Sequence, residues 1–144
     1  LEDQDFKSLV ETRILLELKT VRLAAIRRTD EDLERIRLAL DAYKVKMLGG
    51  QDCLEEDLLF HLAIASASKN STINTLMLLI TPEIIVAYDQ DRVCDGDVAL
   101  LEVKKHEDIY LAILEQNPQR AKETMKFHFA KLYDYIYGED RKIK

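Results

Sequence analysis

The 144-residue sequence predicts an all-α fold, an antiparallel bundle of six to seven helices. Apolar residues recur at spacings of three and four along nearly the whole chain, which is the period of an amphipathic helix. Only four glycines and two prolines are present, too few for the many tight turns of a β-sandwich or barrel. Short loops between long amphipathic helices make neighbours antiparallel. The length fits one domain, residues 1–144.

The first two helices are predicted from apolar stripes and from a capping signal between them. The first covers about residues 5–28. Thr29 begins the second, because its hydroxyl can accept a hydrogen bond from an unpaired N–H and three acidic residues follow at the positive end of the helix dipole. Gly49 and Gly50 end this helix.

The third and fourth helices are separated by a short polar break. The third should run from about Asp52, as its N-cap, to Ser68. The fourth covers about residues 71–89 and contains Pro82. Because an internal proline removes one backbone hydrogen bond, we expect this helix to be kinked or divided.

A polar loop at 91–97 precedes the last two predicted helices. The fifth covers about residues 97–116. Asn117 and Pro118 begin the sixth, because Asn is a good N-cap and proline is tolerated at the first helical position. We expect the sixth helix to end at Gly138.

Composition limits the class of function. The formal net charge is −6, and phosphate binding needs a basic face, so this chain is not expected to bind nucleic acid by itself. No run approaches the ~20 apolar residues of a membrane span, and the acidic N-terminus is unlike a signal peptide. Two isolated cysteines fit a reduced, cytoplasmic protein. The absence of an initial Met indicates a piece of a longer chain.

All three histidines fall on inward stripes of different predicted helices. His61 follows Asp57 by one helical turn, so both side chains emerge on one face. Any one histidine on such a stripe is more often a core residue with a hydrogen bond than a ligand. Three imidazoles and a carboxylate are nevertheless costly to bury without a shared partner. A metal ion bound by Asp57, His61, His106 and His128 would meet that need, with one or two positions left open.

Arg13 and Asn70 are further candidates, each with a structural alternative. Arg13 lies on the inward stripe of the first helix, where the pattern by itself favours an ion pair with Glu17. Alternatively, its guanidinium binds a carboxylate that enters the bundle. Asn70 follows the third helix, either as a helix-terminal residue or within reach of a bound ligand.

Several segments carry a resemblance to one family. Asp57 to His61 and Asn70 fit a D-x-x-F-H…A-x-x-N pattern, and His128 closes an A-x-x-x-M-x-x-H pattern. Matching segments also lie at 11–17, 23–25, 29–33, 105–109 and 112–113. Together they resemble the FCD domain, the C-terminal effector-binding domain of FadR-type GntR transcription regulators, over nearly the whole chain.

The resemblance implies a metal site and an effector site. In the metal-binding branch of that family, one Asp and three His hold a divalent ion, and these roles fall on Asp57, His61, His106 and His128. Zinc is favoured, with nickel or manganese as alternatives. An arginine of the first helix helps to bind the effector's carboxylate, which favours Arg13. A winged-helix DNA-binding domain would precede residue 1.

We therefore expect a sensor of a small carboxylate effector that forms a homodimer, contacts DNA only through the preceding domain and has no contact with a membrane. One alternative is a metal-dependent helical-bundle enzyme, a hydrolase or transferase. Glu56 and Glu107 adjoin the candidate ligands, but adjacent helical positions point elsewhere, so no catalytic residue is predicted. A third alternative is an interaction module whose histidines belong to the core and bind no metal.

Overall fold

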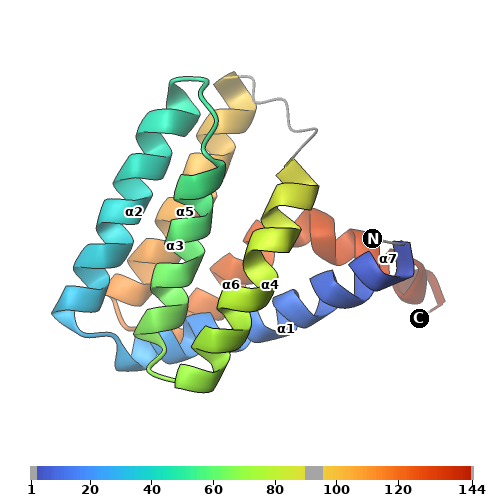
Figure 1. Cartoon of the computed structure of the whole chain (residues 1–144), viewed down its shortest axis with the longest axis horizontal. Coiled ribbons are helices and arrows are strands. Elements are labelled where there is room, and N and C mark those ends of the chain that lie inside the picture. Colours follow the sequence, from blue (N-terminus) through green and yellow to red (C-terminus); the bar gives the residue numbers. More distant parts are fainter. Residues whose placement is uncertain (1–2, 90–95, 144) are drawn as a thin grey trace.

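The protein is a bundle of α-helices, as the apolar periodicity predicted (Figure 1). The computed structural model describes residues 3–89 and 96–143, with side chains at 4–83 and 96–138. No strand occurs within these ranges. The helices are α1 (Asp3–Arg27), α2 (Asp30–Leu48), α3 (Leu54–Ala67), α4 (Ser71–Asp89), α5 (Gly96–Leu114), α6 (Pro118–His128) and α7 (Ala130–Ile143).

The helices pack around one main apolar cluster and a smaller one. Helix α2 packs against both α3 and α5, and α1 runs across one end of these helices toward α7 (Figure 1). Helix α1 also packs on α3, α4, α5 and α6, so it is the central element of the bundle. The main core is apolar and includes Val10, Ile36, Phe60, Ile109 and Met125. No described helix is both long and apolar enough to cross a membrane.

Capping chemistry places most helix starts where the sequence predicted them. Thr29 forms a capping box with Asp32, in which the Thr29 hydroxyl accepts from the Asp32 backbone N–H and the Asp32 carboxylate accepts from the Thr29 backbone N–H. Asn117 accepts from the backbone N–H of Arg120. The prediction of Asp52 as the N-cap of α3 is wrong: the N-cap is Cys53 and the helix begins at Leu54, whose backbone N–H donates to the Asp52 carboxylate one residue before the cap.

Four expectations about the later part of the chain need correction or fall on residues that the structure does not describe. Helix α4 is not divided at Pro82, and a kink there stays a prediction. The predicted sixth helix is two helices, α6 and α7, because the chain turns at Phe129 and buries that ring in the core. Gly138 lies inside α7, so it does not end the helix. Most of the predicted loop at 91–97 lies outside the described residues.

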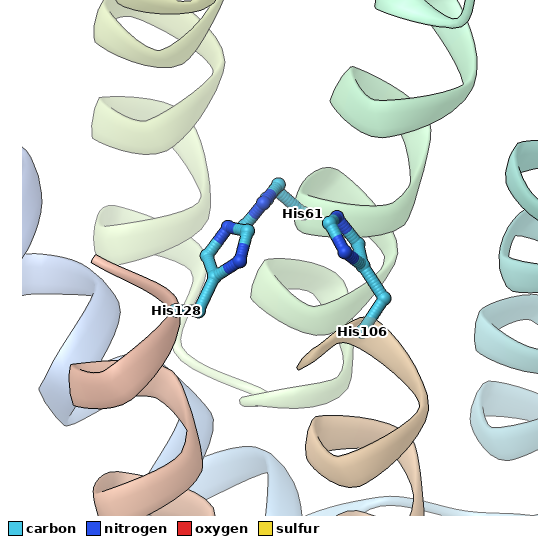
Figure 2. Close-up of side chains that lie close together, drawn as sticks. All are labelled: His61, His106 and His128. Carbon is cyan, nitrogen blue, oxygen red and sulfur yellow. The ribbon is translucent and has the colours of Figure 1, made fainter. Parts of the chain in front are cut away.

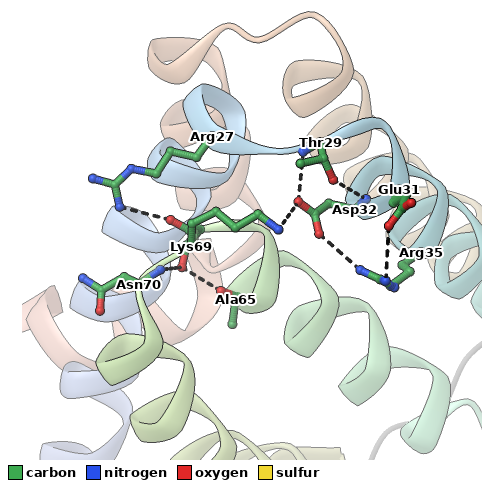
Figure 3. A network of polar contacts seen from close by, with 9 residues as sticks. Arg27, Thr29, Glu31, Asp32, Arg35, Ala65, Lys69 and Asn70 are labelled. Atoms are coloured by element: carbon green, nitrogen blue, oxygen red, sulfur yellow. Dashed lines mark hydrogen bonds and ion pairs between the residues drawn. The ribbon is translucent and has the colours of Figure 1, made fainter.

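A cluster of polar side chains joins the α1–α2 corner to the α3–α4 corner (Figure 3). We call it the corner network; it consists of Arg27, Thr29, Asp32, Arg35, Ser68 and Lys69. Lys69 Nζ lies 2.7 Å from Asp32 Oδ2, and Arg27 donates to the Ser68 carbonyl at 3.1 Å. These contacts fix the end of α3 against the start of α2 and hence the position of the α3 side chains in the bundle.

Candidate metal centre

Three histidines from three helices converge inside the bundle (Figure 2). His61 lies on α3, His106 lies on α5, and His128 is the last residue of α6. One nitrogen of each ring lies within 4.8 Å of one nitrogen of each other ring. His61 and His106 are fully buried and His128 is half-buried. The structure thus brings together the three residues that the sequence predicted to face inward; metal binding by them stays a prediction.

Asp57 adds a carboxylate to the three rings. Its Oδ1 lies 2.8 Å from His106 Nε2 and 3.4 Å from His61 Nε2. Burial alone raises the pKa of this carboxyl, but the hydrogen bond from His106, the close approach of His61 and the charges of both rings outweigh burial and hold the pKa well below its usual range. Asp57 is therefore an ionised carboxylate that faces two imidazole nitrogens.

The Nδ1 atoms of the three histidines have different surroundings. His106 Nδ1 donates to the backbone carbonyl of Glu102 at 2.7 Å, which directs Nε2 toward Asp57. His61 Nδ1 lies 2.6 Å from Glu17 Oε2 on α1. His128 Nδ1 is buried and has no hydrogen-bond partner among the described residues.

The surroundings shift the pKa values of His61 and His128 in opposite directions. Burial lowers the pKa of both rings. At His61 the negative charges of Glu17 and Asp57 outweigh burial and raise the pKa to about 9. At His128 burial acts together with the positive charges of His106 and His61, and the pKa falls well below its usual value. His128 is thus a neutral imidazole, the form that binds metal ions.

This donor set fits a divalent metal ion. Three imidazoles and one carboxylate suit zinc and its neighbours in the first transition row. Both ring nitrogens of His61 and Nδ1 of His128 lack an aligned hydrogen-bond partner in the described protein, a shortfall that is unusual for buried polar atoms and that a bound ion relieves at the ligating nitrogens. Imidazole nitrogens bind zinc at about 2.0–2.1 Å, so nitrogens within 4.8 Å of one another need only small ring shifts to share one ion.

Arg13 lies beside this cluster and carries a buried positive charge. Only 3% of its surface is exposed, and it forms no ion pair with any described residue. Its guanidinium carbon lies 4.9 Å from the centre of the Phe129 ring, which also contacts His128 and His61. The predicted ion pair with Glu17 is not formed, because Glu17 contacts His61 instead. A buried guanidinium without a counter-ion is suited to binding an anion.

Asn70 has a structural role in this fold. Its side-chain oxygen accepts from the backbone N–H of Ile73 at 3.0 Å, so it caps the start of α4. Asn70 therefore lies between α3 and α4 and serves as the N-cap of α4. Contact with a ligand stays a prediction.

The acidic neighbours of the candidate ligands point away from the centre, as predicted. Glu56 pairs with Lys46 at 3.3 Å, and Glu107 pairs with Lys44 at 3.1 Å. Both pairs lie on the side that faces α2. Neither glutamate is thus placed to act as a catalytic acid or base beside the histidines.

The comparison with known families identifies the domain. A family model described as the FCD domain matches residues 8–131. The chain belongs to the FCD domain family. This agrees with the resemblance in the sequence and with the helical fold, and Asp57 and the three histidines all lie inside the matched range.

Relatives of this FCD domain are transcription regulators by name. It is 32% identical over 146 residues to the "HTH-type transcriptional regulator LutR" of Bacillus subtilis, covering 96% of this chain and 65% of the relative. It is 26% identical over 140 residues to the "Uxu operon regulator" of Haemophilus influenzae, covering 92% and 53%. Neither name describes an enzyme, which favours the regulatory interpretation over the enzyme alternative.

Solved structures agree with the fold. Streptococcus agalactiae GntR matches with a TM-score of 0.78 and 26% identity, over 92% of this chain and 60% of that one. Escherichia coli McbR/YncC matches with a TM-score of 0.68 at 20% identity, which supports the fold alone. The FCD domain described here spans between about half and two thirds of the length of these proteins.

Proposed function

We propose that this FCD domain senses a small organic acid for a bacterial transcription regulator of the GntR family, and that it binds the acid together with a divalent metal ion inside the bundle. The observation that carries the proposal is the cluster of Asp57, His61, His106 and His128 beside an arginine, Arg13, that has no counter-ion among the described residues. A centre with this many unmatched polar atoms is better explained by a ligand than by packing.

The metal would be held by Asp57 and the three histidines, with zinc favoured and nickel or manganese as alternatives. When bound, the ion supplies an open position that can take water or a carboxylate. The charges of the buried residues favour an anion. With the three histidines neutral, as they are when they ligate a metal ion, Asp57 and Glu17 contribute two negative charges and Arg13 one positive charge, so a divalent ion would leave the centre with a net charge of +1. One carboxylate would neutralise it.

Control of DNA binding would follow from a shift between arrangements of a homodimer. The acidic domain itself, with a net charge of −6, is poorly suited to contact phosphates. DNA would instead be contacted by a winged-helix domain that precedes residue 1. The acid would favour one relative placement of the two DNA-binding domains by binding that arrangement more tightly.

The proposal is tested by thermal unfolding with a panel of small mono- and dicarboxylic acids, with and without zinc. At least one acid should raise the melting temperature of the zinc-loaded protein, because a ligand that binds only the folded state stabilises it. Arg13→Met should weaken that acid's affinity at least about 10-fold, the loss of a charge-assisted pair. Arg120→Met, which changes an exposed arginine on α6, is the matched control.

Two results would contradict the proposal. One is that no acid in the panel stabilises the zinc-loaded protein. The other is that an acid is turned over by the protein, which would support the enzyme alternative instead.

A further inference from the structure

We infer that Glu17 is a positioning residue of the metal centre. It holds the imidazole ring of His61 by its Nδ1, so that Nε2 is presented to the ion. The inference rests on the proposed function for the ion itself, and on the contact between α1 and α3 for the role of Glu17.

The contact is short, charged and excluded from water. Glu17 Oε2 lies 2.6 Å from His61 Nδ1, and the two residues are 1% and 0% exposed. The carboxylate lies off the direction of the ring N–H, so the pair is an ionic contact that a small ring rotation would turn into an aligned hydrogen bond. In the described part of the chain, no lysine or arginine pairs with Glu17.

Burial of the Glu17 carboxylate costs free energy that its contact with His61 must offset. It lies on the core face of α1, between the fully buried Ile14 and Val21. A carboxylate in such surroundings loses the hydration that it has in water, and the nearby Arg13 does not pair with it. His61 is the group that the carboxylate does contact.

The side of the ring decides between a positioning residue and a metal ligand. His61 Nε2 faces Asp57 at 3.4 Å, whereas Nδ1 faces Glu17. An ion on the Asp57 side is thus bound through Nε2, and Glu17 lies behind the ring. A carboxylate on the distal nitrogen of a metal-binding histidine fixes its tautomer and orientation and makes it a stronger donor.

The three histidines differ in the group that contacts Nδ1. His106 is held by a neutral backbone carbonyl, and His128 Nδ1 has no partner in the described protein. His106 and His61 both face Asp57 through Nε2, but of these two only His61 has a charged group at Nδ1, on the far side of the ring. Loss of Glu17 should therefore change the centre through His61 without removing any ligand.

The experiment compares Glu17→Gln, Glu17→Asp and the control Glu11→Gln, a half-buried glutamate of the same helix. Zinc affinity is measured by competition with a chromophoric chelator, and the ligand field is read from the visible absorption of bound cobalt. Circular dichroism verifies that each variant is folded. Glu17→Gln should weaken zinc binding about 10- to 100-fold and shift the cobalt bands. Glu17→Asp should give an intermediate affinity, and Glu11→Gln should match the wild type within about two-fold.

The possible results distinguish failure of the metal site from failure of the role of Glu17. Wild-type protein that binds neither zinc nor cobalt overturns the proposed metal site and this inference together. Wild-type protein that binds zinc, with wild-type affinity and cobalt bands in Glu17→Gln, overturns only the inference. If Glu17→Gln does not fold, Glu17→Asp decides: wild-type affinity and bands in that variant overturn the role of Glu17.

Discussion

The corner network and the metal centre each contain buried charge, yet they differ in how well that charge is paired. The corner network buries one carboxylate, Asp32, among exposed cationic side chains. In the corner network the buried Asp32 carboxylate accepts from the Thr29 backbone N–H and pairs with Lys69 and Arg35. In the metal centre Arg13, Glu17, His61 and His128 retain buried atoms without aligned partners in the described protein. Complete pairing is typical of a network that holds the fold, whereas a shortfall marks a site that a ligand completes.

The largest expected difference between the two clusters is the loss of zinc affinity when one candidate ligand is removed. We expect His106→Ala to lower zinc affinity by more than about 100-fold, above the 10- to 100-fold typical of losing a group that only holds a ligand. Asp32→Ala should leave zinc affinity within about three-fold, because Asp32 lies in the corner network. Isothermal titration of both variants checks the contrast, and equal losses in the two would refute it.

Zinc should stabilise the folded domain through the metal centre alone. At a free zinc concentration of 100 times Kd, the free energy of unfolding should rise by about 2.7 kcal/mol. Urea denaturation with zinc or with a chelator measures this increment. We expect the same increment in Asp32→Ala and none in His106→Ala; an increment in His106→Ala would mean that zinc binds elsewhere.

Asp32→Ala should instead lower the stability of the metal-free domain. The variant loses the capping box and a buried carboxylate with two cationic partners, but Lys69 and Arg35 can turn to solvent. The expected cost is about 1–3 kcal/mol in urea denaturation at pH 7. Glu31→Ala, an exposed neighbour in the same helical turn, should cost less than about 0.5 kcal/mol. Equal losses of stability in Asp32→Ala and Glu31→Ala would show that the corner network does not stabilise the fold.

The corner network should also make stability depend on acidity. Burial raises the pKa of Asp32, but the hydrogen bonds from Lys69 and Thr29 outweigh it and lower the pKa below the ordinary value. This stabilisation is present above the unfolded-state pKa, near 3.9, and is lost as pH falls through the lower folded-state pKa. The stability difference between wild type and Asp32→Asn should therefore shrink from pH 7 to pH 2.5. A difference that stays constant would show that Asp32 is not the cause.

Asn70, which adjoins the corner network through a hydrogen bond from its backbone N–H to the Ser68 hydroxyl, gives the smallest expected effect. Asn70→Ala removes the α4 cap and should cost about 1 kcal/mol of stability. If capping is its whole role, the affinity for a stabilising acid stays unchanged, whereas a contact with the ligand would lower that affinity as well. Asn70→Ser, which retains a capping oxygen, separates the two roles in the same titration.

Local chemistry made much of this fold predictable from the sequence. The start of α2 followed from Thr29 and its acidic successors, and the start of α6 from Asn117 and Pro118, because caps act within one turn of the chain. The turn at Phe129 carried no such signal. It contains neither glycine nor proline, and its ring is held by core contacts with Arg13 and two histidines.

The candidate centre was predictable only where helical spacing defines it. Asp57 and His61 share a face because they are one turn apart, and inward stripes placed His106 and His128. Glu17 was missed as a partner of His61. Its nearest sequence partner was Arg13, and the alternative lies 44 residues further along the chain, a distance that periodicity cannot resolve. A carboxylate on an inward stripe was the one signal in the sequence that could have indicated it.

The central claim is that Asp57, His61, His106 and His128 bind one divalent ion. Crystals of zinc-treated protein, measured on both sides of the zinc absorption edge, test it most directly. We predict a single anomalous peak inside the bundle, within about 2.0–2.2 Å of all four side chains. The absence of a peak among these residues, or a peak only at the protein surface, would contradict the account.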